Sequence, residues 1–135
     1  MRPPAVLNAY DCWQLLPTEE VARVAWEGPD GVAIVPVNYT VAGQTLWFQT
    51  QPYSALGRQC KGGRLAVEVD HLDPADRSAW SVVAIGWAQL VDGGDVPDAV
   101  RRMELWIPGP RSLAVRVEPV KLTGRRVWGR ERTQG

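Results

Sequence analysis

The sequence is poor in the side chains that most often carry out chemistry. Its 135 residues include one histidine, His71, and two cysteines, Cys12 and Cys60. A hydrolytic triad needs a nucleophile oriented by that single histidine, and a transition-metal site needs several such ligands, so we expect neither and no bound metal. We expect the two cysteines to be plain thiols in a reducing compartment rather than a disulfide. Dinucleotide-fold glycine motifs and P-loop motifs are absent as well.

Long hydrophobic runs and an excess of charge are also missing. No run approaches the roughly 18 apolar residues of a membrane helix, and the first residues lack the apolar core of a secretory signal. We therefore expect a cytoplasmic protein without membrane contact. Lys plus Arg and Asp plus Glu number 15 each, so no overall field recruits nucleic acid. The length suits a single domain, 1–135, with residues 1–6 and 129–135 as loose termini.

What the sequence does contain is a series of short strand patterns separated by turn residues. The alternating apolar segments predict strands at 21–26, 32–39, 45–50, 65–70, 80–91 and 113–122. Strands of this number joined by short turns favour a closed or split antiparallel barrel, so the fold is predicted to be mainly β. Pro36 forbids one ladder hydrogen bond, which places it at an edge, a bulge or a ligand-facing gap. Gly86 is predicted to mark a bulge.

Two or three short helices are expected besides the strands. The predicted ranges are 7–16, with Asn8 as N-cap, then 53–60 and 96–106, and residues 71–79 are predicted to be a loop. The segment Thr50–Ser54 joins a strand to the second helix. Hydroxyls and amides at such a point can bind phosphate, and Arg58, one turn later, can add a cation. The alternative for this segment is an ordinary capped helix.

Several sequence blocks occur in a characteristic order between residues 11 and 126. They are GPDG, PVNY, LWFQT, EVDHLDPADRSAWSVVAIGWA and WIPGPRSLAVRVEPVKLTGRR. In this order they resemble the pyridoxamine 5′-phosphate oxidase-like proteins of the FMN-binding split-barrel group, and in particular the nitroimidazole-reductase-like branch. The resemblance implies a six-stranded split barrel, a homodimer and a flavin, FMN, in each groove between the subunits. It also implies an oxidoreductase that transfers a hydride or electrons to a small flat acceptor.

The resemblance also implies positions for the cofactor-binding residues. Carried over by position, it places backbone groups of Val35, Pro36, Val37 and Asn38 along the isoalloxazine ring, Thr50 and Ser54 at the phosphate, Trp80 and Ser81 in the groove from either subunit, and Arg111 near the site. The sequence implies no catalytic side chain. The flavin would therefore supply the redox chemistry, and the protein would bind and orient it.

Two positions depart from the family pattern. Many relatives have an arginine or similar residue where this chain has Gln49, and a lysine where it has Ala55. Losing two charge-assisted hydrogen bonds, each worth about 1.5–3 kcal/mol, would weaken phosphate binding by roughly two to four orders of magnitude unless Arg58 or another cation replaces them. The alternatives are therefore a weakly held FMN, a deazaflavin, or a non-redox module that binds a flavin, deazaflavin or haem on the same dimeric barrel.

Overall fold

Six strands close into an antiparallel barrel in the computed structural model, which describes residues 2–106 and 113–130. The strands are β1 (Ala5–Leu7), β2 (Val21–Gly28), β3 (Gly31–Ala42), β4 (Thr45–Thr50), β5 (Arg64–Asp73), β6 (Ser78–Val91) and β7 (Leu113–Val127). The sheet order is β1-β7-β4-β3-β2-β5-β6, and the ring closes because β7 also pairs with β6. The predicted six-stranded barrel is confirmed, and β1 is a short seventh strand outside the ring.

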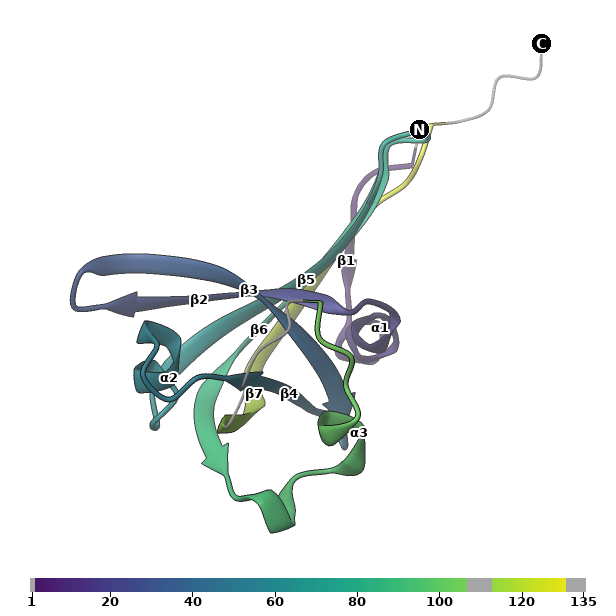
Figure 1. Ribbon diagram of the computed structural model, residues 1–135. Helices are drawn as coiled ribbons and strands as arrows, with labels where there is room; N and C mark the ends of the chain where they lie inside the picture. The colour runs from purple at the N-terminus through teal and green to yellow at the C-terminus, as the bar shows by residue number, and fades with distance from the viewer. Residues whose placement is uncertain (1, 107–112, 131–135) are drawn as a thin grey trace.

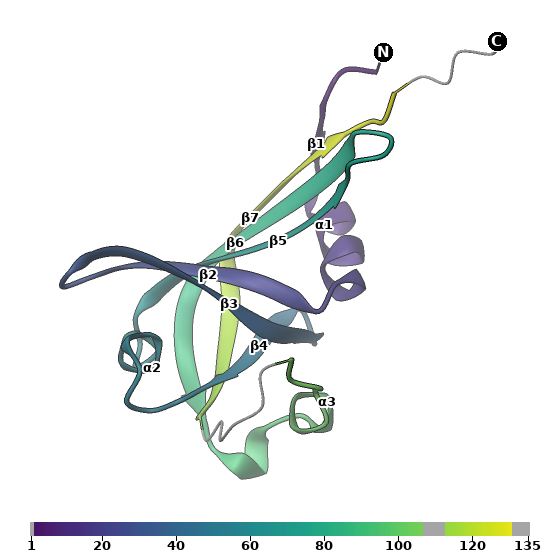
Figure 2. The same cartoon turned by 45° about the horizontal axis from the view of Figure 1, so that its top comes forward.

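Two extensions leave the barrel in opposite directions. Figures 1 and 2 show the β2–β3 hairpin projecting to one side, while β5, β6 and β7 continue past the ring toward the chain termini. The predicted loop 71–79 is mostly strand, because β5 and β6 pair as far as Asp73 and Ser78. Residues 5 and 6 are not loose as expected, since β1 pairs with 124–126 of β7. At the other terminus Arg130 donates its backbone N–H to Asp76, and 131–135 lie outside the described residues.

The core lies inside the ring, with one helix closing its end. Alternate residues of the strands point inward and are fully buried, among them Phe48, Leu46, Val67, Val82 and Val115. Helix α1 (Ala9–Leu15) begins as predicted at Asn8, whose Oδ1 accepts the Asp11 N–H at 2.8 Å. Cys12 of α1 packs so closely on β7 that a Cβ at Gly124 would lie 2.7 Å from its sulfur. Only glycine allows the helix to approach the strand this closely.

The other two helices are shorter than predicted. Helix α2 (Ala55–Gln59) begins after Ser54 as expected, but α3 (Asp98–Arg101) is one turn long rather than covering 96–106. Val96 and Val100 pack on Trp47 and form a small second core. After that turn the chain extends toward β3, where the Trp106 N–H donates to Asn38 Oδ1 at 2.8 Å. This tertiary hydrogen bond holds residues that a longer helix would have contained.

Several local predictions are confirmed by the backbone. The Gly28–Gly31 turn joins β2 to β3, and a register shift marks the bulge between Ile85 and Gly86. Cys12 and Cys60 are both free and buried, and burial raises the pKa of the Cys60 thiol to about 12. Among the described residues no helix combines the length and apolar character needed to span a bilayer.

Candidate functional site

The barrel opens where β3 and β4 separate. β3 pairs with β2 from Gly31 to Asn38, but it pairs with β4 only through Tyr39–Ala42. From residue 31 to residue 38 the other edge of β3 therefore has no strand partner among the described residues. A cavity of about 320 Å³ lies against this edge. Unpaired backbone groups at a strand edge are available for a ligand.

The direction of the backbone groups along this edge follows from one hydrogen bond. The Tyr39 N–H donates to the Glu20 carbonyl across the β2–β3 ladder at 3.1 Å. Hydrogen-bonded and non-hydrogen-bonded pairs alternate in an antiparallel ladder, so residues 38, 36 and 34 turn their backbone groups away from β2. The edge thus presents the Pro36 carbonyl next to the Asn38 N–H. Because residue 36 donates no hydrogen bond to β2, a proline here costs the β2–β3 ladder nothing, and its position at an edge, one of the predicted alternatives, is confirmed.

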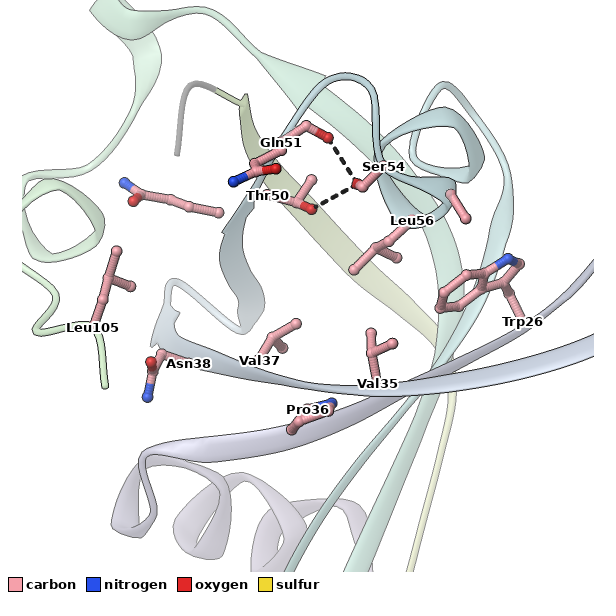
Figure 3. Close-up of a pocket in the computed structure, with 12 residues that line it drawn as sticks. Trp26, Val35, Pro36, Val37, Asn38, Thr50, Gln51, Ser54, Leu56 and Leu105 are labelled. Atoms are coloured by element: carbon pink, nitrogen blue, oxygen red, sulfur yellow. Dashed lines mark hydrogen bonds between the residues drawn. The ribbon is translucent and has the colours of Figure 1, made fainter. Parts of the chain in front are cut away.

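The described walls of the cavity are mostly apolar and include no charged side chain. Figure 3 shows Val35 and Val37 pointing into the space from β3, with Leu56 of α2 facing them and Trp26 at one end. Apart from Asn38 of β3, the polar members lie near the end of β4. The described lining residues are Trp26, Val35, Pro36, Val37, Asn38, Gln49, Thr50, Gln51, Ser54, Ala55, Leu56 and Leu105. The structure thus brings together six of the predicted site residues: Val35, Pro36, Val37, Asn38, Thr50 and Ser54.

The hydroxyl of Ser54 is engaged in local structure. Its Oγ donates to the Gln51 carbonyl at 2.8 Å and accepts the Gly57 N–H at 2.9 Å, so it caps α2. Thr50 Oγ1 lies 3.3 Å from the same oxygen. A serine hydroxyl has a single proton to donate, so Ser54 has none left for an anion. Ser54 therefore caps the helix, as in the capped-helix alternative, and Thr50 is left as the donor in its hydrogen bond with Ser54.

The side chains of Arg58 and Asn38 make contacts that the sequence did not predict. Arg58 Nη1 donates to the Tyr53 carbonyl at 2.9 Å, and its side chain lines a neighbouring hollow, not the cavity. The Asn38 side chain donates to the Glu20 carbonyl at 3.4 Å and accepts from Trp106. Asn38 therefore anchors the segment that brings Leu105 to the cavity wall, and its backbone remains at the open edge.

Two further predicted residues, Trp80 and Ser81, do not line this cavity. Trp80 and Ser81 lie in β6, where they pair with His71 and Asp70 on one side and with β7 on the other. Arg111 lies outside the described residues. Trp26, Gln51, Leu56 and Leu105 were missed by the sequence analysis, although the alternation in 21–26 already places Trp26 on the inward face of its strand.

Titratable groups gather on the outside of the barrel. Arg23 Nη1 lies 3.1 Å from Asp70 and 3.7 Å from Glu68. The pKa of Glu68 is raised, mainly because the carboxyl group is partly buried and to a smaller extent because Asp70 lies beside it. His71 Nδ1 lies 2.9 Å from Glu19. Among the described residues no three metal-binding side chains cluster. The cavity thus offers a hydrogen-bonding strand edge and apolar walls rather than an acid–base pair.

Comparison with known proteins agrees with the fold. A protein of Mycobacterium smegmatis described as an FAD binding protein is 31% identical, with a TM-score of 0.75 over 90% of this chain and 96% of that one. A candidate pyridoxamine 5′-phosphate oxidase from Corynebacterium glutamicum is 25% identical, with a TM-score of 0.77 over 97% and 98%. The uncharacterized protein Rv0080 of Mycobacterium tuberculosis is 29% identical over 133 residues, covering 94% of this chain and 88% of its own length. The model of the pyridoxamine 5′-phosphate oxidase family matches residues 8–126, so the chain belongs to that family of split-barrel proteins.

Proposed function

We propose that the cavity binds the ring of a flavin and that the protein is a flavin-dependent oxidoreductase acting on a small flat acceptor. The observation that carries this proposal is the edge of β3 that has no strand partner within 2–106 and 113–130, facing a cavity whose described walls are mostly apolar and uncharged. The M. smegmatis protein, 31% identical, is described as binding FAD, which supports the choice of ligand.

The residues present fit an isoalloxazine ring. One edge of that ring carries an N–H donor flanked by carbonyl acceptors, and the edge of β3 offers the Pro36 carbonyl next to the Asn38 N–H. Val35, Val37 and Leu56 supply apolar surface for the faces of the ring. The bound flavin would supply the hydride or electron transfer. The chain would hold the ring, orient it and keep water from one side.

Haem fits this cavity poorly. Iron in haem needs an axial ligand such as a histidine, a methionine, a cysteine or a tyrosine. None of the described residues that line the cavity is of these types. The single histidine, His71, lies on β5 against Glu19. The described walls of the cavity therefore offer no axial ligand to a haem iron.

A non-redox module that binds a flavin or a deazaflavin is the second candidate. It is favoured by the absence of a titratable side chain among the described cavity walls. Such a wall can hold a ring but supplies no proton to a reaction. Substrate turnover distinguishes this candidate from an oxidoreductase.

We further propose that two copies of the chain together form the complete site. We also propose that the protein is cytoplasmic. The cavity of about 320 Å³ is at the lower end of the range for small-molecule pockets, so part of a flavin would lie outside one chain. Next to the cavity, Val32 and Ile34 of β3 are 81% and 63% exposed, an apolar surface that a partner would cover. The partner would then contribute the predicted Trp80, Ser81 or Arg111. Two free, buried thiols agree with a reducing compartment.

Spectroscopy of the purified protein tests the proposal. We expect a flavin absorption spectrum, release of the flavin on denaturation, and a dimer by light scattering. Anaerobic reduction by NADH or NADPH, followed by reoxidation with a quinone or a nitro compound, would establish the oxidoreductase. A colourless protein that takes up neither FMN nor FAD would refute flavin binding. Binding without turnover would favour the second candidate, and a monomer would contradict the shared site.

A further inference from the structure

A second hollow adjoins the cavity, on the other side of Trp26 and Ala55. Its volume is about 350 Å³, and it lies between α2 and the β2–β3 turn. The described residues that line it are Trp26, Gly28, Pro29, Asp30, Gly31, Ala33, Ala55, Arg58 and Gln59. Building on the proposed flavin site, we propose that the ligand is a flavin dinucleotide whose adenylate half lies in this second hollow, with Arg58 on the adenylate phosphate and Asp30 on the adenylate ribose.

The first cavity is poorly suited to the terminal phosphate of a mononucleotide. Such a phosphate carries about −1.5 to −2 charges at neutral pH. The described walls of the cavity hold no cation, and the proton of Ser54 is already donated to Gln51. In FAD the phosphate on the ribityl chain is a diester with a single charge, and the second charge lies on the adenylate phosphate, one linkage further along the ligand. The chemistry of the wall therefore favours a phosphodiester over a phosphomonoester.

The second hollow supplies the groups that the first one lacks. Arg58 uses Nη1 on the Tyr53 carbonyl, and its remaining N–H groups can bind phosphate oxygens in the paired geometry that guanidinium groups favour. Asp30 lies in the turn on the opposite side of the hollow. A carboxylate that accepts the ribose hydroxyls is a recurrent feature of dinucleotide sites. One cation and one anion together suit a phosphate followed by a sugar better than they suit a free anion.

Ala55 lies at the junction of the two hollows and lines both. Its short side chain takes up little of the space between them, whereas a lysine here would extend into that space and add a cation to the cavity wall. Ala55 stands where many relatives have a phosphate-binding lysine. The same alanine would let an elongated ligand extend from the first cavity into the second hollow. Gly28 widens the same region, because a Cβ there would lie 3.3 Å from Trp26 Nε1.

Titration of the flavin-free dimer with FAD, FMN and riboflavin tests the proposal. We expect FAD to bind at least about tenfold more tightly than FMN. Arg58→Ala should raise the Kd for FAD about 10- to 100-fold and change the Kd for FMN less than about threefold, because it removes a charge-assisted hydrogen bond to the adenylate phosphate, which FMN lacks. Lys61→Ala, which removes a charge from the same segment outside the hollow, should change neither. Circular dichroism checks that each variant is folded.

Two further variants make the test independent of Arg58. Ala55→Lys should reverse the preference, weakening FAD and strengthening FMN. Asp30→Ala should weaken FAD, whereas simple removal of a repulsive charge would strengthen it. The proposal is overturned if wild-type protein binds FAD and FMN equally, if Arg58→Ala weakens both alike, or if Asp30→Ala tightens FAD. Failure to bind any of the three flavins would instead overturn the flavin site itself.

Discussion

Gly57 of α2 offers a sharp test of how the wall of the cavity is built. A Cβ added at this position would lie 2.1 Å from the Gln51 carbonyl oxygen and 3.1 Å from the Pro52 carbonyl oxygen. Both atoms belong to the backbone, so the contact cannot be relieved by rotating a flexible side chain. Gly57→Ala must therefore push the segment between β4 and α2 away from the helix.

The expected loss of stability follows from two opposing terms. Overpacking of a close contact costs about 1–3 kcal/mol, and the shortness of this contact places it at the upper end. Alanine in a helix recovers about 1 kcal/mol relative to glycine. The net destabilisation is then about 2 kcal/mol, which lowers Tm by about 5–10 °C in a domain of this size. Because Gln51 also lines the cavity, flavin affinity should fall together with Tm.

Thermal unfolding followed by circular dichroism measures this effect, with Gly94→Ala as the matched control. A Cβ at Gly94 would have no atom within 4 Å, so that variant should match the wild type or be slightly more stable. Equal Tm values for the two variants would refute the argument, since the clash at Gly57 would then be relieved at no cost.

Three other predictions concern single side chains. Tyr39→Phe removes the hydroxyl that donates to the Leu16 carbonyl in the core, and it should lower the free energy of unfolding in urea by about 1–2 kcal/mol; an unchanged midpoint would contradict this. Cys60, fully buried with its pKa raised to about 12, should react with thiol reagents only at the rate of unfolding, and fast labelling of native protein would contradict it. The pKa of Glu68 is raised in the folded state, mainly by burial and then by Asp70, so the folded protein binds this proton more tightly than the unfolded chain. Stability should therefore fall as pH rises above about 4.5, and Glu68→Gln should flatten that slope; an identical pH profile in the variant would exclude Glu68 as its source.

Local chemistry made several features predictable from the sequence. Strand β4 has the predicted bounds, Thr45–Thr50, because alternating apolar residues lie between two clear turns. Asn8 and Ser54 cap their helices as expected, because a short side-chain oxygen can reach backbone N–H groups three residues later. Pro36 was expected at an edge, a bulge or a ligand-facing gap because it has no N–H to donate, and it lies where β3 has no β4 partner. Each of these depends on a few neighbouring residues in the chain.

Other features depend on residues that are distant in the sequence. Strand β1 is three residues long and forms only because 124–126 of β7 are available to it. Helix α3 is one turn long, and the chain that follows it is tied to β3, where Asn38 accepts the Trp106 N–H. Helical spacing alone put Arg58 on the side of Ser54, but the packing of α2 turns it into the second hollow.

The sequence by itself therefore determined the strands, the turns, the caps and the membership of a split-barrel family, since these follow from local patterns and from the order of its blocks. Only the tertiary structure decided that β3 leaves β4 after four residue pairs, that the resulting edge faces a cavity with no charged side chain among its described walls, and that Arg58 lies beyond Ala55. The physical reason is that ring closure joins strands far apart in the chain, and the direction of each backbone group and each cation follows from that closure.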